Sequence, residues 1–146
     1  MIALIQRVNE ASVTVEEDRV ANINSGVLAL IGIQRDDEHS QAQRLLERIL
    51  NYRIFADDQD RMNLSLRDIS GDLLLVPQFT LAADTQKGNR PGFSQGACPD
   101  KARELFESLC EHAKAIYPGT QTGVFSADMK VGLVNDGPVT FWLEVH

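Results

Sequence analysis

The chain has 146 residues, about the size of one ordinary domain, and 43% of its residues are apolar and 24% charged. A domain of that length buries roughly two thirds of the surface that its unfolded chain exposes, so it needs neither disulfides nor metals to fold. The composition excludes a disordered or collagen-like chain. The net charge of −7 argues against a protein that grips long nucleic acid, because such binding requires clustered lysine and arginine.

No segment indicates a metal centre, a membrane span or a secretion signal. Cys98 and Cys110 form no CxxC pair and have no histidine at ligand spacing, so we expect both to pack as small apolar residues. The apolar stretch Met1–Val8 is short and has no basic region before it, and no stretch approaches the roughly 20 apolar residues of a membrane helix. We expect one cytoplasmic domain over residues 1–146, without a metal or cofactor.

The first part of the chain predicts four strands followed by a helix. Alternating residues in 2–8 and 11–16 indicate two tightly joined strands, with a short third strand over 19–23. The nearly continuous apolar run 27–33 is typical of a strand buried on both faces. The acidic turn 35–38 then begins a helix with one apolar stripe at i, i+3, i+4 spacing. The stripe consists of Ala42, Leu45, Leu46, Ile49 and Leu50.

The second part predicts a loop over 83–98 and a second amphipathic helix that begins with Pro99, where a missing N–H costs nothing. Its apolar face consists of Ala102, Leu105, Phe106, Leu109, Ala113 and Ile116. The predicted strands of this part are 52–57, 72–81, 122–125, 129–134 and 139–145. Each helix can cover one face of a sheet, so we expect an α/β fold: a single layered domain, mostly β sheet with two amphipathic helices covering it.

Conventional catalytic groups are hard to find. His39 lies at a helix start, His112 on the polar side of the second helix and His146 at the chain end. We therefore expect each histidine to lie on the solvated surface. The sequence contains no GxSxG elbow, HExxH pair, P-loop or GxGxxG. Side-chain catalysis by a triad or a metal is therefore not indicated.

The segment Val76–Leu81 places polar groups where the pattern predicts burial. It continues an apolar run and contains Pro77, which cannot donate a hydrogen bond to a neighbouring strand. One interpretation is a strand with a kink at its edge. The other is that the kink frees backbone N–H groups, which can stabilise a developing oxyanion, and presents Gln78 and Thr80 to a pocket.

The segment Asn135–Thr140, with the sequence NDGPVT, has the residues of a hairpin turn between the last two strands. A glycine followed by proline also allows a cis peptide bond, although only about 5–6% of X–Pro bonds in folded proteins are cis. The residues alone leave both conformations open.

These two segments resemble the two signature motifs of the D-aminoacyl-tRNA deacylase family, at the spacing that the family uses. The resemblance extends over essentially the whole chain. It includes Met1–Val8, Tyr52–Phe55, Met62–Leu64, the loop Gly88–Ser94 and the stretch from Thr122 to Met129.

The resemblance implies an enzyme that hydrolyses the ester of D-aminoacyl-tRNA, acting on the aminoacylated 3′ end of tRNA as a homodimer with its active site at the subunit interface. Gly137 and Pro138 would form a cis pair inserted from one subunit into the other, excluding L-amino acids by steric hindrance. Glycine would also be accepted when charged to tRNA. No DNA or membrane partner is implied.

The resemblance also assigns roles to the remaining residues. Gln78, Phe79 and Thr80 would form the catalytic floor near the ester, with catalysis relying largely on the 2′-hydroxyl of the terminal ribose. Arg7 would brace the Gly-Pro segment. Phe125 and Met129 would line a pocket for the terminal adenosine. From the residues alone, Arg7 could equally be a strand-edge charge and the other two could belong to the core.

The chain departs from the family pattern at two positions. Pro77 stands where the first motif usually begins with serine, and Cys98 stands where the second helix usually has a serine cap, which could cost about 1 kcal/mol of stability. Two other functions stay open: a hydrolase with Thr80 as nucleophile, and a non-catalytic dimeric module that binds RNA or assembles with a partner.

Overall fold

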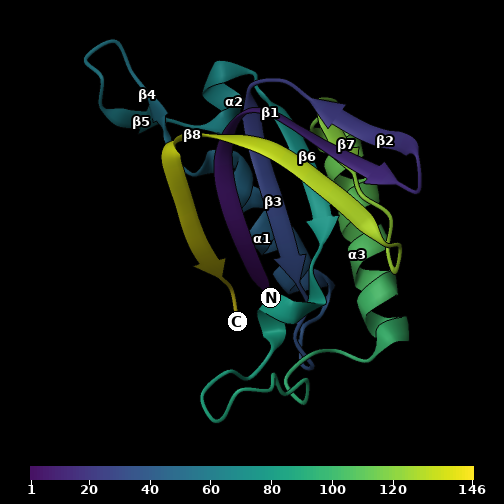
Figure 1. The fold of residues 1–146 in the computed structure, drawn as a ribbon. Coiled ribbons are helices and arrows are strands. Elements are labelled where there is room, and N and C mark those ends of the chain that lie inside the picture. Colours follow the sequence, from purple (N-terminus) through teal and green to yellow (C-terminus); the bar gives the residue numbers. More distant parts are fainter.

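The computed structural model describes all residues 1–146, which form a six-stranded sheet with two long helices behind it (Figure 1). In chain order the elements are β1 (Ile2–Val15), β2 (Asp18–Ile23), β3 (Gly26–Gly32), α1 (His39–Asn51), β4 (Phe55–Ala56), β5 (Met62–Leu64), α2 (Leu66–Ile69), β6 (Asp72–Pro77), the 3₁₀ helix η1 (Phe79–Ala82), α3 (Pro99–Ile116), β7 (Thr120–Thr122) and β8 (Met129–Glu144). The α/β architecture agrees with the sequence prediction.

β1 organises the sheet, because it pairs with three other strands. Its first half pairs antiparallel with β3 and its second half with β2, while β8 runs antiparallel along its whole length. The prediction of two separate strands, 2–8 and 11–16, is therefore wrong. An irregularity between Val8 and Glu10 changes which side chains point inward, so one continuous strand has the sequence pattern of two.

The sheet continues from β3 to β6 and β7 through parallel pairing, which gives the order β2-β1-β3-β6-β7 with β8 as an edge strand beside β1. The sheet is also curled, so that β2 approaches β6 and β7. A backbone N–H of β2, that of Asn22, donates to Gln121 Oε1 of β7 at 2.7 Å. The inside of this nearly closed, barrel-like sheet holds a cluster of apolar residues. They are Val8, Ala11, Val13, Ala21, Ile23, Leu28, Leu74 and Val76.

The larger core lies between the outside of the curl and the helices. All five predicted stripe residues of α1 are buried, as are five of the six predicted apolar residues of α3, with Ile116 partly buried. Both helices lie on the same face of the sheet (Figure 1). The sequence predicted that each helix could cover one face of a sheet without saying which face. The structure places both on the same face, and the curl of the sheet closes much of the other.

Several short elements differ from the sequence prediction. Of the predicted strand 52–57 only Phe55–Ala56 is extended, and it pairs with β5 in a separate small hairpin. The helix α2 was not predicted, although Ser65 and Asp68 form a capping box at its start. The predicted strand 122–125 is instead β7, which ends at Thr122. None of the helices has the length and apolar character that a membrane crossing requires.

Candidate active site

The first motif lies where β6 ends. The prediction of a strand through Leu81 is wrong beyond Pro77, because the chain turns there into η1. The Gln78 N–H still donates to the carbonyl of Ile31 on β3, at 2.7 Å, so the sheet ends one residue after the proline. The N–H groups of Phe79 and Thr80 then fall in the first turn of η1, where a helix has no carbonyl of its own to accept them.

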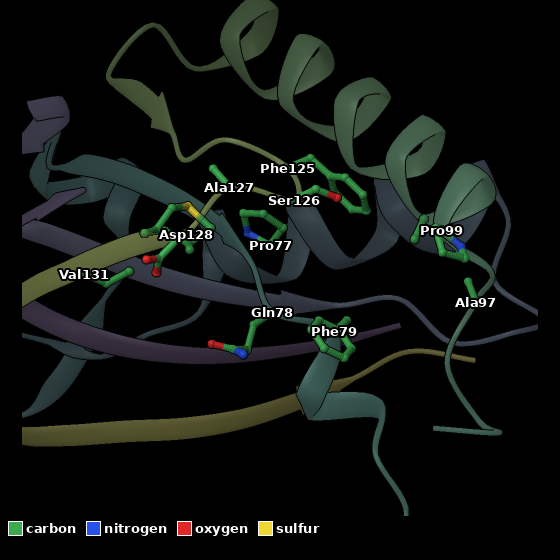
Figure 2. A pocket seen from close by; sticks show the side chains of 13 residues that line it. Pro77, Gln78, Phe79, Ala97, Pro99, Phe125, Ser126, Ala127, Asp128 and Val131 are labelled. Atoms are coloured by element: carbon green, nitrogen blue, oxygen red, sulfur yellow. The ribbon is translucent and has the colours of Figure 1, made fainter. Parts of the chain in front are cut away.

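A pocket of about 600 Å³ opens beside this turn. Figure 2 shows Phe125 and Pro99 on one side of it and Gln78 and Phe79 on the other, with Pro77 between them. The full lining is Val76, Pro77, Gln78, Phe79, Ala97, Pro99, Ala102, Phe125, Ser126, Ala127, Asp128, Met129 and Val131. Pockets of roughly 300–1,000 Å³ with a mostly apolar lining are the usual sites for small ligands.

Four of the predicted site residues therefore meet at one pocket: Gln78, Phe79, Phe125 and Met129. Thr80 is not among the lining residues. Its hydroxyl accepts a hydrogen bond from Gln78 Nε2, and its side chain is exposed. The structure thus places the Gln78 amide and the Thr80 hydroxyl against each other, with no basic side chain bonded to that hydroxyl.

The wall of the pocket opposite Phe79 is held by α3. The Phe125 ring lies 6.2 Å from the Phe106 ring, centroid to centroid, and 4.9 Å from Arg103 Cζ, a cation–π distance. Met129 Sδ accepts from the Val124 N–H at 3.4 Å. Arg103 was not predicted as a site residue. It lies on the polar face of α3 in the sequence pattern, and no neighbouring residue indicates its contact with Phe125.

The second motif is an insertion in a strand, so the prediction of a hairpin turn is wrong. β8 pairs with β1 on both sides of the motif: Thr140 lies opposite Gln6 and Asn135 opposite Val8. Four residues, Asp136 to Val139, therefore lie opposite the single residue Arg7. The Gly137–Pro138 peptide bond is cis, as the family resemblance implied, and both residues are exposed. We refer to Asp136–Val139 as the Gly-Pro insertion.

Arg7 braces the Gly-Pro insertion from the helix side of the sheet. Its Nε donates to the carbonyl of Asp136 at 3.0 Å and lies 3.3 Å from the Asp136 carboxylate. Its Nη1 donates to the carbonyl of Ile54 at 2.7 Å. Because the Arg7 side chain is only 15% exposed, this contact is a partly buried structural link rather than a strand-edge charge.

Within one chain, the two motifs lie far apart. Arg7 is aligned through Val27 of β3 with Leu73 of β6, four residues before Pro77. Three strand spacings and four residues along a strand separate the Gly-Pro insertion from the pocket by roughly 15–20 Å. The structure therefore joins Arg7 with Gly137 and Pro138, and Gln78 with Phe125, but it does not join these two groups.

None of the histidines and cysteines is among the residues that line the pocket. His39 and His146 are exposed, and His39 Nε2 lies 3.4 Å from Glu104 Oε1 at the contact of the two long helices. No histidine lines the pocket, and no group of three or more potential metal ligands exists. Cys110 is buried as expected, and burial raises its pKa to about 12. Cys98 is exposed, contrary to expectation, because it is the N-cap of α3 at the pocket rim.

Comparison with known proteins identifies the family. The family model described as D-Tyr-tRNA(Tyr) deacylase matches residues 4–144. The chain belongs to the D-aminoacyl-tRNA deacylase family. It is 57% identical to the D-aminoacyl-tRNA deacylase of Citrobacter koseri over 145 residues, which cover 99% of this chain and 100% of that protein. The identity to the protein of the same name from Escherichia coli O9:H4 (strain HS) is 54% over the same coverage. As a member of this deacylase family the protein is a hydrolase.

Solved structures share the fold of this deacylase family member. A structure named c-Myc DNA Unwinding Element Binding Protein superimposes with a TM-score of 0.95 and 35% identity, covering 100% of this chain and 99% of that one. A probable eukaryotic D-amino acid tRNA deacylase superimposes with a TM-score of 0.86 over 99% of this chain and 98% of that one. At 17% identity the latter likeness concerns the fold alone.

Proposed function

We propose that the protein hydrolyses the ester of D-aminoacyl-tRNA, releasing the free D-amino acid and tRNA, as a chiral proofreading step of translation in the cytoplasm. The observation that carries this proposal is the pocket of about 600 Å³, which brings Gln78 and Phe79 together with Phe125 and Met129. Its size and apolar lining suit a terminal adenosine with its attached amino acid. Phe125 and Met129 line the adenosine side, and the first motif forms the floor beside the ester.

Catalysis in this proposal uses backbone groups and the substrate itself. Water adds to the ester carbonyl carbon, the bond to the ribose oxygen breaks, and that oxygen leaves as a hydroxyl. The N–H groups of Phe79 and Thr80, in the first turn of η1, stabilise the developing oxyanion. The vicinal 2′-hydroxyl of the terminal ribose assists, because a positioned neighbouring hydroxyl can supply several kcal/mol. The lining contains no histidine, and its one carboxylate, Asp128, is exposed and paired with Lys130, which supports this route over a side-chain base.

Selectivity in this proposal comes from the Gly-Pro insertion of a second copy of the chain. The carbonyl groups of Gly137 and Pro138 hold the α-amino group and occupy the space where an L side chain would project, so L substrates are excluded and D substrates are not specifically gripped. Glycine has no side chain to exclude, so glycyl-tRNA is also a substrate. The separation of roughly 15–20 Å between the insertion and the pocket within one chain supports a site built from two subunits.

A second copy also has a surface on which to dock. The edge strand β8 exposes Trp142, which is 51% exposed. Because paired residues share a face, Trp142, Leu4, Leu30 and Val76 form one row across β8, β1, β3 and β6. This row lies on the face opposite the helices. Leu4 and Leu30 are partly exposed, whereas Val76, at the end of the row, is buried and lines the pocket. We therefore propose a homodimer with the active site at the interface.

The charge of the chain restricts the contact with tRNA. With a net charge of −7, the protein lacks the clustered cations that hold long nucleic acid. The proposed contact is confined to the aminoacylated 3′ end, where a few positioned groups suffice, and affinity for the rest of the tRNA is weak.

The first experiment measures release of amino acid from matched D-, L- and glycyl-tRNA by the purified protein without added metal. The proposal expects fast release of the D and glycyl forms and an intact L form. Absence of release from all three would overturn it in favour of a binding module, which would hold charged and uncharged tRNA alike. A stable monomer with full activity would overturn the two-subunit site.

A second experiment addresses the Thr80-nucleophile alternative. Because the Thr80 hydroxyl accepts from Gln78 Nε2 and no base contacts it, Thr80→Ala is expected to keep substantial turnover. Near-total loss of turnover with an unchanged fold would favour the nucleophile instead.

A further inference from the structure

We infer that Asn135 and Thr140 are positioning residues that set chiral selectivity, because their side chains close the neck of the Gly-Pro insertion and fix where it points. The inference rests on the proposed function and deepens it. It concerns residues that flank the Gly-Pro pair without belonging to it.

The strand pairing defines the neck. Asn135 and Thr140 are the last β8 residues aligned with β1 on either side of the insertion, opposite Val8 and Gln6. The four inserted residues lie opposite a single β1 residue, Arg7, which has no paired residue in β8. An insertion of this size in an edge strand forms no strand ladder of its own, so its conformation depends on the Arg7 contact and on bonds across its own base.

Two side-chain hydrogen bonds supply that closure. Asn135 Nδ2 donates to Thr140 Oγ1 at 2.9 Å, and the Val139 N–H donates to Asn135 Oδ1 at 3.0 Å. One amide group therefore contacts both the last inserted residue and the strand residue after it. Asn135 suits this position because its side chain carries both a donor and an acceptor.

The neck and Arg7 act from opposite faces of the sheet. Gln6 and Val8, the partners of Thr140 and Asn135, flank Arg7 along β1. Val8 points to the inside of the curl, and Arg7 reaches the helix-side loop at Ile54. Arg7 holds the beginning of the insertion at Asp136, and Asn135 holds its end at Val139. The exposed Gly137 and Pro138 are thereby fixed between two anchors.

Fixing the insertion matters more for the L substrate than for the D substrate. Exclusion by steric contact works only if the obstructing group cannot yield. The D substrate meets no obstructing group, and the carbonyl groups that hold its α-amino group stay within reach when the insertion is only loosened. A loosened neck therefore admits L substrates while leaving the pocket intact.

The test compares Thr140→Val, which keeps the shape but cannot accept the hydrogen bond, with Thr140→Ser, which keeps the acceptor. For Thr140→Val we expect the ratio of D to L hydrolysis to fall roughly three- to tenfold, the size expected for one side-chain hydrogen bond, with KM for the D substrate unchanged. Thr140→Ser is expected to restore the ratio. Thr14→Val, in β1 away from the insertion, is the matched control.

Amide hydrogen exchange at Val139 tests the neck without any substrate. We expect faster exchange in Asn135→Ala and Thr140→Val and wild-type exchange in Thr140→Ser. Unchanged exchange in both weakened variants would overturn the inference whether or not the protein is a deacylase. Faster exchange with an unchanged D to L ratio would overturn the link to selectivity. A wild-type protein inactive on all substrates would overturn the proposed function instead, and with it that link.

Discussion

The Gln78–Ala82 segment and the Gly-Pro insertion both interrupt strands of one sheet, but they do so by opposite means. At Pro77 the strand ends, and the chain turns into η1 beside a pocket. At Asn135 the strand continues after a four-residue excursion, because β1 pairs with it on both sides. One interruption creates a concave site and the other an exposed projection. The proposed two-subunit site needs both shapes, with the projection of one copy placed in the concave site of the other.

The largest effect is expected from a substitution in the projection. Gly137 has φ +140, and a Cβ atom there would lie 2.6 Å from Val139 Cγ2 and 2.9 Å from the Val139 backbone nitrogen. Gly137→Ala must therefore change the backbone of the insertion itself and move the carbonyl groups proposed to hold the α-amino group, which a loosened neck does not. We expect D-aminoacyl-tRNA hydrolysis to fall about 100-fold, the loss that a misplacement of about 1 Å can cause. Single-turnover rates measure it.

The matched control is Gly132→Ala, in the same strand. A Cβ atom there would meet only Ser12 Oγ, at 3.3 Å, and Gly132 has no positive φ. Its activity is expected to stay within about twofold of the wild type, because surface changes of this kind have small effects. Equal losses in both variants would mean that the insertion has no special role.

Mixing two inactive variants tests most directly whether the two regions act across a subunit interface. Gly137→Ala damages the projection, and Ala127→Trp fills the pocket of an otherwise intact chain. If the two regions act across the interface, a heterodimer contains one intact site, and refolding the chains together should restore at least tenfold more activity than either alone. No recovery, with heterodimers verified by mass, would place both regions in the same subunit's site.

A smaller effect is expected on the pocket side. Phe125→Leu removes the ring that packs on Arg103 and Phe106. We expect about a tenfold increase in KM with little change in kcat, since ring contacts with a base contribute about 1–3 kcal/mol of binding. Steady-state kinetics separates the two constants. A fall in kcat alone would assign Phe125 to the chemical step.

The smallest effect is expected in the core, away from both regions. Burial raises the Cys110 pKa from 9.0 to about 12, so the folded state holds this proton more tightly than the unfolded state. The resulting contribution to stability is complete below pH 9 and is lost as pH rises from 9 towards 12. Cys110→Ala should flatten the alkaline decline in the free energy of unfolding, measured by denaturant titration, and leave hydrolysis at pH 7 unchanged.

The two long helices and β3 were predicted correctly from the sequence pattern within each element. The apolar stripes of α1 and α3 were predicted correctly, because a 3.6-residue period is visible within the helix itself. β3 was also predicted, from its continuous apolar run. The errors fell where a pattern depends on a distant partner. The strand prediction continued past Pro77, because Phe79 and Leu81 are apolar residues typical of a strand and nothing local indicates that the pairing of β6 with β3 stops at Ile31.

Some residues of the candidate site were predicted from the sequence, and others were found only in the structure. Family resemblance brought out Gln78, Phe79, Phe125 and Met129, which the structure gathers at one pocket. Arg103 was missed, because a cation–π contact between α3 and a loop 22 residues further along leaves no trace in the period of either. Thr80 was assigned to the floor mainly through its backbone; its hydroxyl accepts a hydrogen bond from Gln78 Nε2, and the role of its N–H stays a prediction.

The fold class, the two helix faces and the two motifs could be predicted from the sequence, because each depends on residue types repeated or clustered within a few positions. Three features became visible only in the folded structure: β1 and β8 are each continuous, both helices lie on one face of the sheet, and NDGPVT projects from an edge strand without reversing the chain. Turn-forming residues specify a local bend, but the strand that pairs beyond the bend is chosen by burial across the whole sheet.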